Sequence, residues 1–345
     1  MADKVLYFPY IQVPESPWFT RTLLYWDEVG SIVPAEYIQE PEELGDYMQE
    51  LVQAQLVKQI FPDRYVHDIP NFTPAFLHFV DSNPTIQNAA QQIGQKLKTT
   101  RIHIAKFGHE LASELCRRNL AKRSQGSWYD VEVQTADLFM AYLASVLGNH
   151  QENNMTPISD RLESLCAFSL KQDLSPSHPS LIDELRGLLL ENLFPAPSAQ
   201  VPVNQLATFK ESNYELLSHL RRKVEAAVLD ISLINDAPTR QRRLSFLKDD
   251  FRQQIVELHS KMNERNWPRI TFGSICGIAA GAIPGIDAVL TSDVTSALKA
   301  VPGLASAIYC AFSGSPRQKD ILSSPLAYVA LAQKKFNMTI DGNDV

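Results

Sequence analysis

The sequence predicts an α+β protein that is predominantly helical: an N-terminal αβ domain with short strands, then a long helical hairpin and small-residue helices. Three patterns support this class. Short β-branched and aromatic runs alternate with helical segments over residues 1–62. Apolar residues recur every three or four positions over 203–265, and two uncharged runs rich in small residues follow residue 270. The first pattern is typical of βαβ units and the second of amphipathic helices.

The first 62 residues supply the expected strands and helices of the αβ domain. KVLYFPYIQV (4–13) predicts a strand. Ser16 can cap a helix that ends near Gly30, because a serine oxygen accepts a backbone N–H of the first helical turn. The segments SIVP and LVKQIFP predict two further short strands, separated by a helix over residues 41–55.

The middle of the chain continues this mixed pattern. TRIHIAKFG (100–108) predicts a strand or a strand-to-helix turn, and SQGSWYDVEVQ predicts a turn that leads into another strand. The segment TADLFMAYLASVLGNH is apolar on all sides and predicts a buried helix. We therefore divide the chain where its composition changes. Residues 1–150 form a mixed αβ domain, 151–202 a helical and loop connector, 203–265 a long antiparallel helical hairpin, and 266–345 a Gly/Ala-rich helical hairpin with a C-terminal helix.

The C-terminal half contains the clearest helical signal. Two periodic segments within 203–265 are interrupted by Asn-Asp-Ala-Pro at 235–238, which predicts an antiparallel helical hairpin. Two 17-residue runs without charge follow, at 270–286 and 300–316. Within the first, four glycines are spaced at four residues, a pattern that lets helices approach closely: Gly273, Gly277, Gly281 and Gly285. We expect close packing in a water-soluble body, with membrane insertion as the alternative that we do not favour.

Composition and charge exclude several classes of protein. The chain has 345 residues, 45% of them hydrophobic and 21% charged, which is typical of a soluble globular protein. The net charge is −7, and residues 1–60 carry ten acidic groups against three basic ones. An acidic N-terminal segment argues against binding along the phosphate backbone of a nucleic acid, which needs clustered Lys and Arg. Nucleic acid is therefore not an expected partner.

The four cysteines predict a reducing compartment. Cys116, Cys166, Cys276 and Cys310 are at least 34 residues apart, and none forms a CxxC pair. The first residues, MADKVLYFPYIQV, do not have the pattern of a secretory signal. We expect free thiols in a cytoplasmic protein with no cofactor and no metal ion.

Enzyme motifs give only one candidate constellation. GxxxxGK[ST], GxGxxG, HExxH and GxSxG do not occur in the sequence. Alternation along YDVEVQ would place Asp130, Glu132 and Gln134 on one face of a strand. An acidic pair of this kind can hold Mg²⁺ in a metal-dependent nuclease, with His103 and Lys106 as further polar groups. The competing interpretation is an exposed strand face.

Two basic clusters flank the predicted hairpin turn. They could contact phosphates or an acidic partner surface, although a solvated helix face is the favoured interpretation because acidic residues lie nearby: Arg221, Arg222 and Lys223 before the turn, and Arg240, Arg242 and Arg243 after it.

Several unusual segments resemble one protein family. The opening YFPYI and LLYWD, together with SPLAYVALAQKKF near the end, are similar to an uncharacterised bacterial family catalogued only by sequence. The resemblance covers most of the chain and implies no activity and no site residues. It implies a genomic context near mobile or antiviral genes.

These patterns favour a non-enzymatic interaction or assembly module in bacterial antiviral defence or stress, with a protein partner or self-association through the hairpin. Two alternatives remain open at this stage. One is a membrane-active effector that uses the Gly/Ala-rich hairpin, and the other is a metal-dependent nuclease or related hydrolase.

Overall fold

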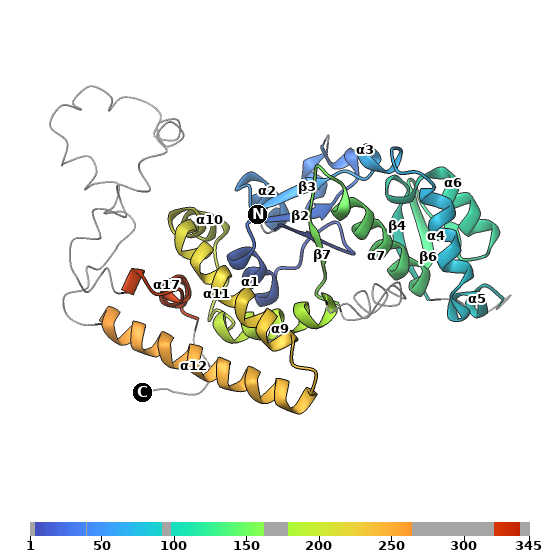
Figure 1. Ribbon diagram of the computed structural model, residues 1–345. Coiled ribbons are helices and arrows are strands. Elements are labelled where there is room, and N and C mark those ends of the chain that lie inside the picture. Colours follow the sequence, from blue (N-terminus) through green and yellow to red (C-terminus); the bar gives the residue numbers. More distant parts are fainter. Residues whose placement is uncertain (1–3, 39, 92–97, 162–178, 264–320, 339–345) are drawn as a thin grey trace, which may run out of the picture. The chain divides into compact units, whose positions relative to one another are not determined.

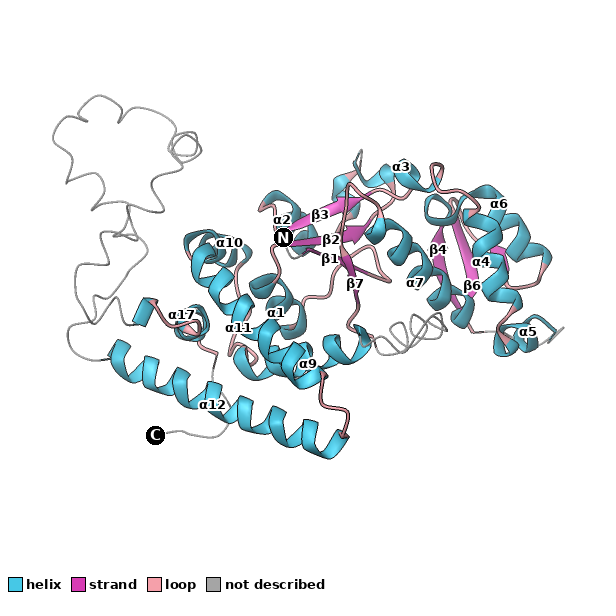
Figure 2. Cartoon of the chain, in the orientation of Figure 1, coloured by secondary structure: helices cyan, strands magenta, loops and turns pink. Residues whose placement is uncertain are grey.

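The computed structural model describes residues 4–38, 40–91, 98–161, 179–263 and 321–338 (Figure 1). The chain divides into two compact units. The αβ unit comprises Met1–Glu184 with Gln200–Ala207, and the helical unit comprises Leu185–Ala199 with Thr208–Val345. Helices predominate in the described ranges and two small sheets accompany them (Figure 2). The predicted α+β, mainly helical class is confirmed.

A four-stranded parallel sheet lies in the αβ unit. Its strand order is β3-β2-β1-β7, with bounds Val57–Ile60, Glu28–Ile32, Lys4–Tyr7 and Thr156–Ile158. β1 therefore pairs with β2 on one side and with β7 on the other. β1 is shorter than the predicted strand because Pro9 has no backbone N–H to donate to a ladder.

An antiparallel sheet forms the second sheet of the αβ unit. Its order is β4-β6-β5, with bounds Thr99–His103, Trp128–Glu132 and Ala121–Arg123. Each of the two longer strands runs directly into a helix: β4 into α6 (Ile104–Arg117) and β6 into α7 (Val133–Asn149). These junctions fix the side chains of His103 and Glu132 at helix N-termini.

The helix α7 is central to the core of the αβ unit. It contacts β1 and β7 of the parallel sheet and β4 and β6 of the antiparallel sheet. Its buried side chains include Phe139, whose ring lies 5.2 Å from that of Phe76 and 5.6 Å from that of Phe107. The remaining helices of this unit are α1 (Pro17–Tyr25), α2 (Asp46–Gln53), α3 (Asp63–Val66), α4 (Phe72–Asp81) and α5 (Pro84–Gln91). Two short 3₁₀ turns, η1 (Ala35–Ile38) and η2 (Pro41–Glu43), lie between β2 and α2.

The helical unit is built around the predicted hairpin. α11 (Tyr214–Ser232) and α12 (Ala237–Asn263) are joined by a short turn, and α17 (Ala327–Phe336) contacts both. The Gln333 amide donates to the Leu193 carbonyl at 2.7 Å, and the tilted rings of Phe209 and Tyr328 have centroids 5.1 Å apart. Two more helices, α9 (Pro179–Leu193) and α10 (Val203–Ser212), each begin in residues of the αβ unit and end in residues of the helical unit.

The first helix of the predicted hairpin is divided. Asn213 has φ −121° and ψ 23°, and its amide donates to the Phe209 carbonyl at 2.8 Å. An asparagine side chain that satisfies the backbone in this way competes with the helical hydrogen bond. The chain therefore forms α10 and α11 where periodicity alone predicts one continuous helix.

No helix within the described ranges combines the length and the apolar character that crossing a bilayer requires.

Candidate functional site

Two of the three residues predicted to share a strand face do lie on β6. Asp130 and Glu132 belong to this strand, whereas Gln134 lies in α7, so the predicted alternation is wrong for Gln134. The reason is that Glu132 caps the helix. Its carboxylate accepts the N–H of Gln134 at 3.0 Å, the N–H of Thr135 at 2.7 Å and the Thr135 hydroxyl at 2.8 Å.

The surroundings of β6 give no metal-ligand set. The Asp130 carboxylate is partly exposed and lies 3.8 Å from Arg101 Nε on the neighbouring strand β4. Among the residues that the structure describes, no group of three or more His, Cys, Asp and Glu side chains is arranged to hold a metal ion.

Replacement of Glu132 separates a structural from a catalytic role. Because Glu132→Ala removes three hydrogen bonds at the start of the central helix, we expect a loss of about 1–2 kcal/mol in the free energy of unfolding. Asp130→Ala, two residues earlier, removes only a partly exposed 3.8 Å ion pair with Arg101 and should change it by less than about 0.5 kcal/mol. Urea unfolding measures both. A Glu132→Ala variant with unchanged stability that loses metal-dependent phosphodiesterase turnover would instead support the nuclease alternative.

His103 ends β4 and is almost fully buried. Its Nε2 lies 3.1 Å from a carboxylate oxygen of Glu36, in the turn that follows β2. Its Nδ1 accepts the Ala105 N–H at 3.3 Å, and its ring packs edge-on against Trp128. Burial lowers the pKa of His103, and the Glu36 carboxylate opposes that change. His103 thus links the end of β4 to the 3₁₀ turn that follows β2.

Lys106 is also buried, with 4% of its surface exposed. Its ammonium donates to the Pro9 carbonyl at 3.4 Å, just after β1. Burial lowers the pKa of this amine to about 7. The partners of His103 and Lys106 therefore come from loops after β2 and β1, at the carboxyl ends of the parallel strands. The sequence named both residues but could not show their burial or these partners.

The basic residues predicted to bind a partner occupy different environments. Arg221 is 5% exposed and belongs to the interior of the helical unit. Lys223 donates to Gln254 at 2.9 Å and lies 5.0 Å from the Phe251 ring centre, and burial lowers its pKa. Arg240 donates to the Ile234 carbonyl at 2.9 Å and holds the hairpin turn. Arg222, Arg242 and Arg243 are exposed.

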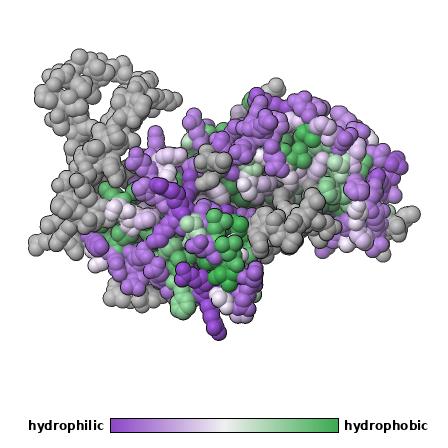
Figure 3. All heavy atoms as spheres, in the orientation of Figure 1, coloured by the Kyte–Doolittle hydropathy of each residue, from purple (hydrophilic) through white to green (hydrophobic). Residues whose placement is uncertain are grey.

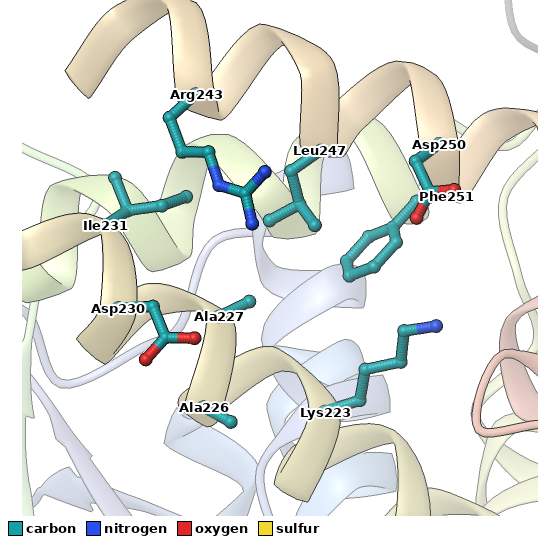
Figure 4. A pocket seen from close by; sticks show the side chains of 9 residues that line it. All are labelled: Lys223, Ala226, Ala227, Asp230, Ile231, Arg243, Leu247, Asp250 and Phe251. Atoms are coloured by element: carbon teal, nitrogen blue, oxygen red, sulfur yellow. The ribbon is translucent and has the colours of Figure 1, made fainter. Parts of the chain in front are cut away.

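A cavity of about 250 Å³ lies between α11 and α12 (Figure 4). Its lining combines four charged with five apolar side chains: Lys223, Asp230, Arg243, Asp250, Ala226, Ala227, Ile231, Leu247 and Phe251. The small side chains of Ala226 and Ala227 leave the space, and Arg243 reaches toward Ala227 from the facing helix. Residues of both predicted basic clusters thus meet in one cavity.

Exposed apolar side chains concentrate on the same hairpin. Seven large apolar residues in the described ranges are exposed, and five of them lie on α11, on α12 or at the turn: Tyr214, Leu229, Leu233, Phe246 and Val256. Leu233 is 77% exposed and Phe246 69%. Figure 3 shows apolar surface gathered around the α11–α12 turn. Phe246 and Val256 fall outside the buried apolar period of α12, which is the sequence signal that could have identified them.

The four glycines of the predicted small-residue hairpin lie outside the described residues. The comparisons with known proteins gave no match to any protein-family model, curated protein or solved structure. The resemblance to an uncharacterised bacterial family therefore stays a prediction.

Proposed function

We propose that this protein is a cytoplasmic interaction module that binds a partner protein through the α11–α12 hairpin. The observation that carries the proposal is the concentration of exposed apolar side chains on this hairpin, which holds five of the seven found in the described ranges. Contiguous apolar surface is costly in water and typically marks a protein interface.

The charge of the hairpin supports a protein partner with acidic character. Residues 214–263 hold nine basic and seven acidic side chains, in a chain whose net charge is −7. Glu225 is engaged with Arg186 at 2.7 Å, and Asp236 accepts the Thr239 N–H at 2.9 Å as a helix cap. These two acids therefore have partners other than Arg242 and Arg243, the exposed arginines that precede Phe246 in α12.

The hairpin is also a rigid platform for such a surface. Its inner face is held by buried side chains of both helices, among them Leu217, Val224 and Phe251. The helix α17 contacts both α11 and α12 and so stabilises the pair. A rigid helical pair loses little conformational entropy on binding, so its exposed side chains can contribute directly to affinity.

The test places a photo-crosslinking amino acid at Phe246 in cells that natively express the protein. We expect a specific crosslinked protein at position 246 and none at Ile38, an exposed residue of the αβ unit that serves as control. Leu233→Ala combined with Phe246→Ala should lower recovery of that protein at least tenfold, as removal of interface anchors does, whereas Ile38→Ala should not. Equal crosslinking at both positions would contradict the proposal.

A crosslink to a second copy of the chain would identify self-association as the form that the interaction takes. The resemblance to the uncharacterised bacterial family supports antiviral defence or stress as the setting. The membrane-active and nuclease alternatives stay predictions.

A further inference from the structure

We propose that the cavity between α11 and α12 receives an acidic side chain of the partner, and that the Arg243 guanidinium pairs with its carboxylate. This inference rests on the proposed function and adds the chemistry by which the partner is recognised.

The cavity has the size and lining of a side-chain site. Its volume of about 250 Å³ lies below the usual range of small-molecule pockets, roughly 300–1,000 Å³. Leu247 and Phe251 form an apolar wall on α12, and Ala226 and Ala227 leave the floor open on α11 (Figure 4). One side chain with an apolar stem and a charged end matches this mixture of surfaces.

Two of the four charged groups in the cavity are already engaged. Gln254 accepts from the Lys223 ammonium at 2.9 Å and donates to the Asp250 carboxylate at 2.8 Å. This amide bridge satisfies a cation and an anion at one end of the cavity.

The other two charged groups have no such partner. Within the described part of the chain, neither the Arg243 nor the Asp230 side chain makes a hydrogen bond or an ion pair. In Figure 4 the Arg243 side chain reaches into the space above Ala227, and the Asp230 carboxylate is turned away from it. The group presented to an incoming ligand is therefore the guanidinium.

A carboxylate fits that group best. The planar fork of a guanidinium donates two parallel hydrogen bonds to a carboxylate, which adds specificity to charge attraction. Lys223 and Asp250 offset each other's charge through the Gln254 bridge, and Arg242 lies next in sequence on the exposed surface of α12. A partner segment that carries Asp or Glu beside an apolar residue could place the acid in the cavity and the apolar residue against Phe246.

The experiment uses a phage-displayed random dodecapeptide library, selected against the full-length protein. Enriched peptides are synthesised, and their Kd is measured by fluorescence anisotropy. We expect a shared Asp or Glu, at least about 30-fold weaker binding to Arg243→Glu, and less than about threefold weakening by Arg242→Glu, the matched neighbouring control. Ala227→Leu, which fills the cavity, should weaken binding similarly to Arg243→Glu. Unchanged Tm values for all three variants keep these comparisons valid.

A second measurement tests the pairing itself. Replacing the shared acid of the peptide by its amide should greatly reduce the difference in Kd between wild type and Arg243→Glu, because neither complex then contains the charge pair. A difference in Kd as large as that seen with the acidic peptide overturns the pairing.

The outcomes separate the two proposals. Peptides that lose affinity for Leu233→Ala with Phe246→Ala but bind Arg243→Glu as tightly as wild type overturn this inference and leave the proposed function standing. Peptides that bind all variants equally overturn both. A library that enriches no peptide overturns the inference, while the crosslinking experiment still decides the proposed function.

Discussion

Replacement of Lys106 by methionine is expected to stabilise the αβ unit by about 2–4 kcal/mol at pH 6. The lysine is buried, its ammonium donates to the Pro9 carbonyl at 3.4 Å, and burial lowers its pKa to about 7. A displacement of the amine pKa by several units corresponds to roughly 4–5 kcal/mol of unfavourable burial of the charge. The loss of the Pro9 contact offsets about 1–2 kcal/mol of the gain.

The gain should depend on pH in a defined direction. The pKa of the amine is about 7 in the folded chain, against an ordinary value of 10.5. Between these pH values the unfolded chain binds one proton more than the folded chain, so the wild-type stability rises with pH over this window. The advantage of the methionine variant is therefore largest at and below pH 7 and shrinks by about 1.4 kcal/mol per pH unit above it.

Urea unfolding of both proteins at pH 6, 7, 8 and 9 measures this difference, because effects of the other ionisable groups cancel between them. Tryptophan fluorescence follows the transition, since Trp18, Trp26 and Trp128 lie in the αβ unit. Lys122→Met, at an exposed lysine of the same unit, serves as control and should change stability by less than about 0.5 kcal/mol. A stability difference that does not vary with pH would show that the Lys106 amine is not the titrating group.

Gly148→Ala is expected to destabilise the αβ unit by about 3 kcal/mol. An added Cβ at this position, near the end of α7, would lie 2.3 Å from the Met155 carbonyl oxygen, which is backbone and cannot rotate away. The Gly148 carbonyl also accepts the Met155 N–H at 2.9 Å. Met155 leads directly into β7, so relief of the clash has to move the strand that pairs with β1.

Gly187→Ala provides the matched control. This glycine lies within α9, and a Cβ added there meets nothing within 4 Å. Alanine should therefore raise stability by about 0.5–1 kcal/mol, because it has the higher helix propensity. Urea unfolding compares the two variants, and hydrogen exchange of the β1 and β7 amides locates the effect of Gly148→Ala. Wild-type exchange rates in β7 would contradict the expected displacement of the strand.

Local sequence patterns predict the elements well where a single period dominates. The apolar spacing of α11 and α12 and the proline-containing break between them predict the hairpin. The cap at Ser16 predicts the start of α1, and its side chain does accept the Phe19 N–H. The predicted end near Gly30 is wrong, because α1 ends at Tyr25 and Gly30 lies within β2. These signals are readable because each depends on residues only a few positions apart.

The candidate site shows where local patterns fail. The carboxylate of Glu132 looks like a catalytic group on a strand, yet it caps α7, because the strand ends at that residue. Asn213 divides a helix that periodicity makes continuous.

The sequence by itself therefore determined the fold class and the helical hairpin. Only the tertiary structure decided that Lys106 is buried against Pro9, about a hundred positions away, and that Arg243 faces a cavity left by two alanines of another helix. Burial, pKa and cavity shape depend on which distant segments meet, and an individual residue carries no local signal of that encounter.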